Sequence, residues 1–180
     1  FSTGASVVVA RYFGARNPEK IGKTVHTAFM MGFLGSLALT ILCEILVPPV
    51  LRLIHTPEGV FGEAVLYLRL YFLGLVPLLL YNIGAGILRG VGDSFRPLLF
   101  LVATCAANVG LDLLFVVVFR WGVAGAALAT VLAQAVACLL VIYTLICSRE
   151  SYRLEGKKLG IDRQILKEIV SIGVPTGLQS

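Results

Sequence analysis

The stretch PLLFLVATCAANVGLDLLFVVVF, residues 97–119, decides the class of the fold. Its only charged side chain is Asp112. At about 1.5 Å of rise per residue, a helix of this length covers roughly 35 Å. A bilayer has a hydrocarbon core about 30 Å thick, and strands with open edges are not tolerated there. The stretch therefore predicts a transmembrane α-helix.

The composition of the whole chain agrees with a lipid environment. Of the 180 residues, 58% are hydrophobic and 14% are charged, whereas an average soluble domain is about 45–50% apolar and about 25% charged. The net charge of +5 comes from basic residues in short loops between apolar runs, so nucleic acid is not an expected partner. The cysteines lie singly and predict neither a disulfide framework nor a zinc site. They are Cys43, Cys105, Cys138 and Cys147.

Three further apolar stretches are long enough to span a bilayer, namely residues 24–47, 64–88 and 123–147. Residues 1–10 resemble the end of an earlier span, and residues 169–180 the start of a later one. Both ends therefore indicate a chain cut within apolar segments. We expect an all-α fold, a polytopic transmembrane helix bundle with four complete spans and two partial ones.

The basic residues alternate from loop to loop. Twelve Lys and Arg residues lie in the loops 11–23, 89–96 and 148–168, and only two, Arg52 and Arg120, lie in the others. The positive-inside rule makes the three basic loops cytoplasmic. The alternation also supports the number of spans.

The loop 148–168 is the only long polar stretch. Gly156 and Gly160 interrupt it, and Asp162 is placed to cap a helix that follows. Isoleucines recur every four residues from Ile161, which predicts a short amphipathic segment on the cytoplasmic surface. The loop is either a plain linker or a hinge between two halves of a transporter.

Asp112 is the most informative residue, because an ionisable group inside a span costs about 2.5–3.5 kcal/mol on insertion scales. Asn108 and Thr104 precede it at successive intervals of four residues. That spacing places the three polar side chains on one face of the helix. They form either a functional site or an interhelical hydrogen-bonding cluster that holds the bundle together.

Thr130 and Gln134 are expected to face this helix. Only residues 119–122 separate the two helices, so they form a tight antiparallel hairpin. Asp112 and Thr130 then lie at one depth, and Gln134 can reach the level of Asn108. Oxygens of these types suit a hard cation or a proton rather than zinc or copper.

Other polar residues in the spans receive lesser roles. Pro77 is expected to kink its span, and Asn82 beyond it is a weaker candidate for lining a cavity, as are Gln134 and Thr104. Glu44 and Arg69 fall near the outer ends of adjacent spans, where we expect a structural ion pair.

Short motifs in a specific order make the chain resemble the multidrug and toxic compound extrusion (MATE) family. Each motif is weak alone, whereas their order and spacing are specific. They occur at residues 10–16 (ARYFGAR), 56–58 (TPE), 87–93 (ILRGVGD), 108–112 (NVGLD), 122–130 (GVAGAALAT) and 173–175 (GVP).

The resemblance implies twelve helices in two lobes and a secondary antiporter that exports organic, often cationic, drugs or toxins in exchange for Na⁺ or H⁺. Residues 1–147 would then be the N-lobe bundle from the end of helix 2 to helix 6. Residues 148–168 would be the cytoplasmic inter-lobe linker, and residues 169–180 the start of helix 7.

The same resemblance implies an ion or proton site at Asn108, Asp112 and Thr130, completed by an acidic residue on helix 1, which this chain lacks. The aspartate at 112 favours the DinF-like prokaryotic branch, and hence the plasma membrane of a bacterium or archaeon. The expected partners are membrane lipid, a small organic substrate and the C-lobe of the same polypeptide, with no cofactor besides the coupling ion.

Two other functions remain open from the sequence. A lipid-linked saccharide flippase of the same two-lobe plan would want a cationic cavity, and the only mid-span base is Arg69, near a membrane face. An intramembrane enzyme would want a second deep acid or a deep histidine beside Asp112, so we do not expect an enzyme. A membrane scaffold without a site is the remaining possibility.

Overall fold

A computed structural model describes residues 2–155 and 160–179 of the chain, and these residues form helices without any strand. The all-α prediction is confirmed. Gly156, predicted to interrupt the long loop, and its neighbours Lys157 and Lys158 lie outside the described residues. The elements are α1 (Ser2–Gly14), α2 (Pro18–Leu53), α3 (Glu58–Leu73), α4 (Leu75–Gly90), α5 (Phe95–Asp112), the π-helix η1 (Leu113–Val118), α6 (Gly122–Cys147) and α7 (Arg163–Gln179).

Four segments in the described part of the chain are long and apolar enough to cross a membrane, as predicted. They are Pro18–Leu53, Glu58–Gly90, Phe95–Val118 and Gly122–Cys147. Most of their side chains are not buried within the protein, and the outer faces carry large apolar residues such as Leu101 and Val102. These faces suit contact with lipid acyl chains.

The longest helix, α2, begins well before the predicted span. Asn17 caps it by accepting a hydrogen bond from the backbone nitrogen of Lys20 at 3.1 Å, and Pro18 occupies the first turn. Both features favour a helix start. With 36 residues, the helix is about 54 Å long, so it extends beyond the hydrocarbon core of the bilayer.

The second predicted span, for which a kink at Pro77 was predicted, is interrupted at the single residue Gly74, whose backbone angles remain helical. The α-helix α3 ends at Leu73, and α4 begins at Leu75. Proline at position i removes a backbone donor and its ring clashes with the carbonyl of residue i−4, which here is Leu73. The prediction thus identified the cause, while the break itself falls at Gly74, about one turn earlier.

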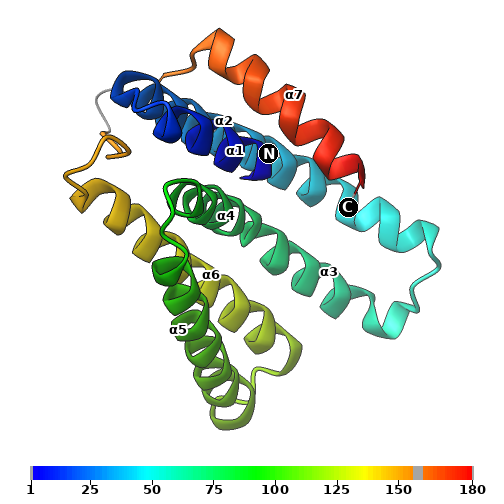
Figure 1. Ribbon diagram of the computed structural model, residues 1–180. Coiled ribbons are helices and arrows are strands. Elements are labelled where there is room, and N and C mark those ends of the chain that lie inside the picture. The colour runs from blue at the N-terminus through cyan, green and yellow to red at the C-terminus, as the bar shows by residue number, and fades with distance from the viewer. Residues whose placement is uncertain (1, 156–159, 180) are drawn as a thin grey trace.

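The helix α4 lies at the centre of the bundle and contacts α1, α2 and α6. On one side α1, α2 and α7 lie together, and on the other side α5 and α6 form a hairpin (Figure 1). The residues from Ile83 to Leu88 of α4 are all buried. They pack with Val25 of α2 and Val141 of α6 in one core.

The three basic loops meet at one end of the bundle. The first turns of α2 and the connection from α6 to α7 line a common cavity, and Arg96 shares a second cavity with the end of α6. This arrangement is the one that the charge alternation requires.

The connection from α6 to α7 ends earlier than the predicted boundary, because α7 begins at Arg163. Asp162 caps it as predicted, and its Oδ1 accepts hydrogen bonds from the backbone nitrogens of Gln164 at 2.9 Å and Ile165 at 3.2 Å. Ile165 and Ile169 are buried, whereas Ile161 is exposed. The predicted amphipathic pattern therefore holds within the helix.

Candidate functional site

The predicted site lies where α5 changes its helical geometry. Asp112 is the last residue of α5, and the π-helix η1 follows at once. In this segment the backbone nitrogen of Phe119 donates to the carbonyl of Leu114 at 2.9 Å, a π-type bond over five residues. Such segments within α-helices frequently mark functional sites, because they reorient the neighbouring side chains. Nothing in the residue pattern had predicted this π-helix.

Two polar atoms of this region are buried without a hydrogen-bond partner among the described residues. They are Oδ1 of Asp112 and Nδ2 of Asn108. An unsatisfied buried polar group costs about 1–3 kcal/mol, and more when it is charged. The two groups are one helical turn apart and are complementary, yet they are not bonded to each other. A proton or a cation would satisfy the carboxylate.

The amide of Asn108 can act either as a hydrogen-bond donor or as an oxygen ligand. In this arrangement it presents a donor, and a rotation about its terminal bond would present an oxygen instead. A hard cation binds carboxylate, amide and hydroxyl oxygens. The residue types on this face of α5 therefore fit Na⁺ as well as a proton.

The hydroxyl groups of Thr130 and Thr104 donate to their own helices. Thr130 Oγ1 donates to the carbonyl of Ala126 at 3.1 Å, and Thr104 Oγ1 donates to that of Phe100 at 2.7 Å. Each hydroxyl oxygen keeps a lone pair for a further partner. Because α6 packs along α5, Thr130 is carried on the helix that neighbours Asp112.

The hairpin of α5 and α6 is held tightly at its turn. Phe115 stacks on Phe119 and Trp121, with ring centroids 6.0 Å and 5.3 Å away. A Cβ added to Gly125 would lie 3.1 Å from the Cβ atoms of Phe115 and Trp121. Small residues at the start of α6 thus allow close packing.

Gln134 reaches the break between α3 and α4. Its Oε1 is buried without a partner among the described residues. A Cβ added to Gly74 would lie only 2.4 Å from that oxygen. Glycine at 74 therefore allows the Gln134 amide to lie against the interrupted backbone of the second span, a contact that the sequence did not predict.

Asn82 belongs to a different part of the molecule. It lines a cavity of about 570 Å³ together with residues of α1, α2 and α7, among them Ser2, Gly32 and Ile169. Its Nδ2 donates to the carbonyl of Leu78 at 2.8 Å. Asn82 thus lines a cavity whose described lining includes neither α5 nor α6.

Glu44 and Arg69 form the expected ion pair, with Oε2 of Glu44 3.5 Å from Nε of Arg69. Nearby, Thr40 Oγ1 donates to the carbonyl of Phe72 at 3.3 Å. Both contacts join α2 to α3. Their position supports the structural role predicted for the pair.

These features define a polytopic α-helical membrane protein in which one carboxylate oxygen of a transmembrane hairpin, Oδ1 of Asp112, is buried without a partner among the described residues. The MatE family model matches residues 1–114, more than half of the sequence. The chain belongs to the MatE family, a family of multidrug efflux transporters.

Individual relatives agree with this assignment. The chain is 29% identical over 185 residues to the probable multidrug resistance protein YoeA of Bacillus subtilis, covering 98% of this chain and 40% of the relative. It is 37% identical over 135 residues to YpnP of the same organism, covering 72% of this chain and 28% of that protein. The crystal structure of MATE in the bent conformation superposes with a TM-score of 0.91 at 30% identity, covering 98% of this chain and 40% of the other. The chain thus spans about 40% of the length of such relatives.

Proposed function

We propose that this chain is the ion-coupling part of a secondary antiporter that exports small organic, often cationic, compounds in exchange for Na⁺ or H⁺. The observation that carries the proposal is that Oδ1 of Asp112 and Nδ2 of Asn108, one helical turn apart, are both buried without a partner in the described part of the chain. Membership of a multidrug efflux family makes transport the context for this carboxylate.

In the proposed mechanism Asp112 alternates between two states. In one state the carboxylate is charged and holds a cation, or is deprotonated; in the other it is neutral and protonated. Neutralisation removes the cost of burying the charge, about 2.5–3.5 kcal/mol within a span. Because α5 and α6 pack along each other, the change in charge alters their packing and thereby the affinity of a neighbouring substrate cavity. Coupling requires such a difference in interaction between the two states.

The alternative of a lipid-linked saccharide flippase is less well supported. A cavity for an anionic lipid carrier needs available positive charge. Arg69, the only Lys or Arg within a predicted span, lies 3.5 Å from the carboxylate of Glu44. Its charge is therefore largely compensated, which favours the antiporter.

Replacement of Asp112 by asparagine in the complete polypeptide tests the proposal. We expect ion-driven efflux of a cationic dye from proteoliposomes to be abolished, while the amount of protein inserted in the membrane stays unchanged. Asp93→Asn is the matched control, since it removes a carboxylate outside the membrane and asparagine can still accept from the backbone nitrogen of Arg96. Efflux at the wild-type rate in Asp112→Asn would refute the mechanism.

The same vesicles distinguish the two coupling ions. An imposed Na⁺ gradient at constant pH drives efflux if Asp112 exchanges Na⁺, and an imposed pH gradient without Na⁺ drives it if Asp112 exchanges a proton. Asp112→Asn is expected to abolish the response that the wild type shows, whether to the Na⁺ gradient or to the pH gradient.

A further inference from the structure

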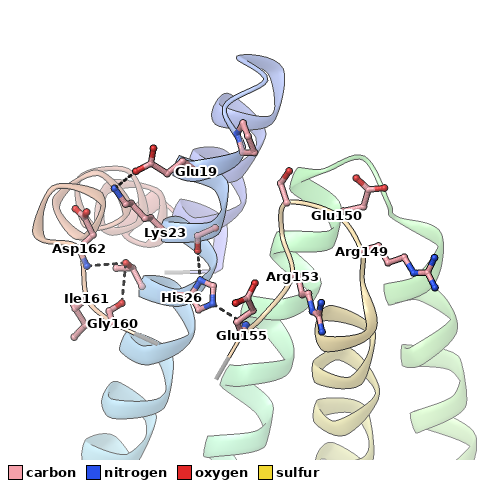
Figure 2. Close-up of a pocket in the computed structure, with 14 residues that line it drawn as sticks. Glu19, Lys23, His26, Arg149, Glu150, Arg153, Glu155, Gly160, Ile161 and Asp162 are labelled. Carbon is pink, nitrogen blue, oxygen red and sulfur yellow. Dashed lines mark hydrogen bonds and ion pairs between the residues drawn. The ribbon is translucent and has the colours of Figure 1, made fainter. Parts of the chain in front are cut away.

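A second buried ionisable group lies outside the proposed coupling site, at the end of the bundle where the basic loops meet. There a cavity of about 810 Å³ opens between the first turns of α2 and the connection from α6 to α7. Figure 2 shows His26 pointing from α2 into this cavity, toward the segment that carries Glu155. The imidazole is only 5% exposed, yet it forms part of the cavity wall.

Both ring nitrogens of His26 are hydrogen-bonded. Nε2 accepts from the backbone N–H of Glu155 at 3.0 Å, and Nδ1 lies 2.6 Å from the carbonyl oxygen of Gly22. A backbone N–H can only donate, so Nε2 must carry a lone pair. A carbonyl can only accept, so Nδ1 must carry the hydrogen. These partners assign a neutral ring with its proton on Nδ1.

The neighbouring residue of α2 anchors the same connection at a second point. Thr27 Oγ1 accepts from the backbone nitrogen of Asp162 at 3.1 Å, and lies 3.4 Å from the carbonyl oxygen of Gly160. Thr27 has no group that titrates, so this contact does not depend on pH. Of the two anchors, only the one at His26 responds to a proton.

We propose that His26 is a cytoplasmic proton-binding site that holds the connection between α6 and α7 against α2 when it is neutral and releases it when it is protonated. A proton added to Nε2 removes the only acceptor in this contact and points an N–H at the N–H of Glu155. The ring must then turn away, and the anchor is lost. Anchoring is therefore present at high pH and disappears as the pH falls.

Charged side chains line the cavity that His26 borders. Among the described residues, four carboxylates and three cations do so. The carboxylates belong to Glu19, Glu150, Glu155 and Asp162, and the cations to Lys23, Arg149 and Arg153. Lys23 donates a hydrogen bond to Glu19 at 2.6 Å.

Release of the connection would change the attachment of α7 to the rest of the bundle. This helix is also held at its side, where Tyr12 donates to the Glu168 carboxylate at 2.8 Å. Loss of the His26 anchor therefore loosens the connection without detaching α7. Cytoplasmic acidification would therefore alter how α7 is attached to α6 and to the rest of the bundle. This effect would be independent of the charge on Asp112.

Hydrogen–deuterium exchange of the complete polypeptide in nanodiscs tests the proposal. Protection factors, which correct for the intrinsic effect of pH on exchange, are compared at about pH 8 and about pH 5.5, the range in which histidine changes charge. For peptides that contain Glu155, the wild type should lose about tenfold in protection at the lower pH, the effect of one lost hydrogen bond. His26→Gln retains an acceptor oxygen that does not titrate, so its protection should be high at both values.

Two further variants complete the test. His26→Leu removes the acceptor and should show low protection at both pH values. Thr27→Val should lower the protection of peptides containing Asp162 while the pH response around Glu155 remains. The proposal is overturned if the wild type shows equal protection at both pH values, or if His26→Gln loses protection on acidification as the wild type does. The Gln variant keeps the test valid even if His26→Leu fails to fold.

Discussion

The crossing of α1 and α7 offers the sharpest test of the packing. Gly4 lies on α1 where that helix crosses α7, and a Cβ added there would be 2.4 Å from the carbonyl oxygen of Ile169. The same Cβ would lie 3.0 Å from the nitrogen of Gly173 and 3.1 Å from its Cα. All three atoms belong to backbone, so no side-chain rotation can relieve the contact. Gly4→Ala must therefore move the two helices apart.

The size of the effect follows from these distances. Ordinary contacts of a Cβ begin at 3.4 Å, so the oxygen at 2.4 Å requires a shift of about 1 Å. Overpacking of this kind costs about 1–3 kcal/mol. Gly14, in the same helix, would have no neighbouring atom within 4 Å of an added methyl group, which makes Gly14→Ala the matched control.

Both variants exchange glycine for alanine within α1, so the difference between them isolates the clash. We expect Gly4→Ala to lower the free energy of unfolding in mixed micelles by about 1–3 kcal/mol relative to Gly14→Ala. The amides of α7 should also exchange faster in Gly4→Ala alone. Equal stability and equal exchange in the two variants would show that α1 and α7 do not cross as described.

Two other predictions concern the same end of the bundle. Tyr12→Phe removes the hydroxyl that donates to Glu168 and accepts from Arg11 at 2.9 Å, so it should cost about 1–2 kcal/mol in the same assay. The Tyr67 hydroxyl has no hydrogen bond within the described residues, so Tyr67→Phe should leave the free energy of unfolding close to that of the wild type. Equal losses of stability in the Tyr12 and Tyr67 variants would contradict the role of the Tyr12 hydroxyl. Asn17→Ala removes the cap on α2 and should cost about 1 kcal/mol, while Asn17→Asp, which can still accept from Lys20, should cost much less. A loss of similar size in both Asn17 variants would rule out the cap as the cause.

Much of the site could be anticipated because it rests on one unusual residue. A carboxylate within an apolar span is costly wherever it lies, so Asp112 stood out without any knowledge of its neighbours. The spacing of Asn108 placed a second polar group on the same face of the helix. Both residues carry buried atoms that have no partner in the described part of the chain. Their role in coupling, and that of Thr130, remains a prediction.

The contact between His26 and the Glu155 backbone could not be predicted from the sequence in this way. A single histidine at the start of a span, beside a basic loop, has no feature that distinguishes it from an ordinary surface residue. Its partner Glu155 is 129 positions away in the sequence, and the contact uses a backbone N–H that any residue type except proline would offer. No pattern of residue types could therefore have indicated it.

By itself the sequence determined the membrane-spanning class, the four spans and the rare carboxylate within a span. These properties follow from the hydropathy and charge of successive residues, which can be summed over each segment of the sequence. Only the tertiary structure decided the π-helix after Asp112, the contact of His26 with the Glu155 backbone and the contact of the Gln134 side chain with Gly74. The last two depend on how closely segments far apart in the sequence approach each other. Such distances are set by the packing of the whole bundle rather than by any one helix.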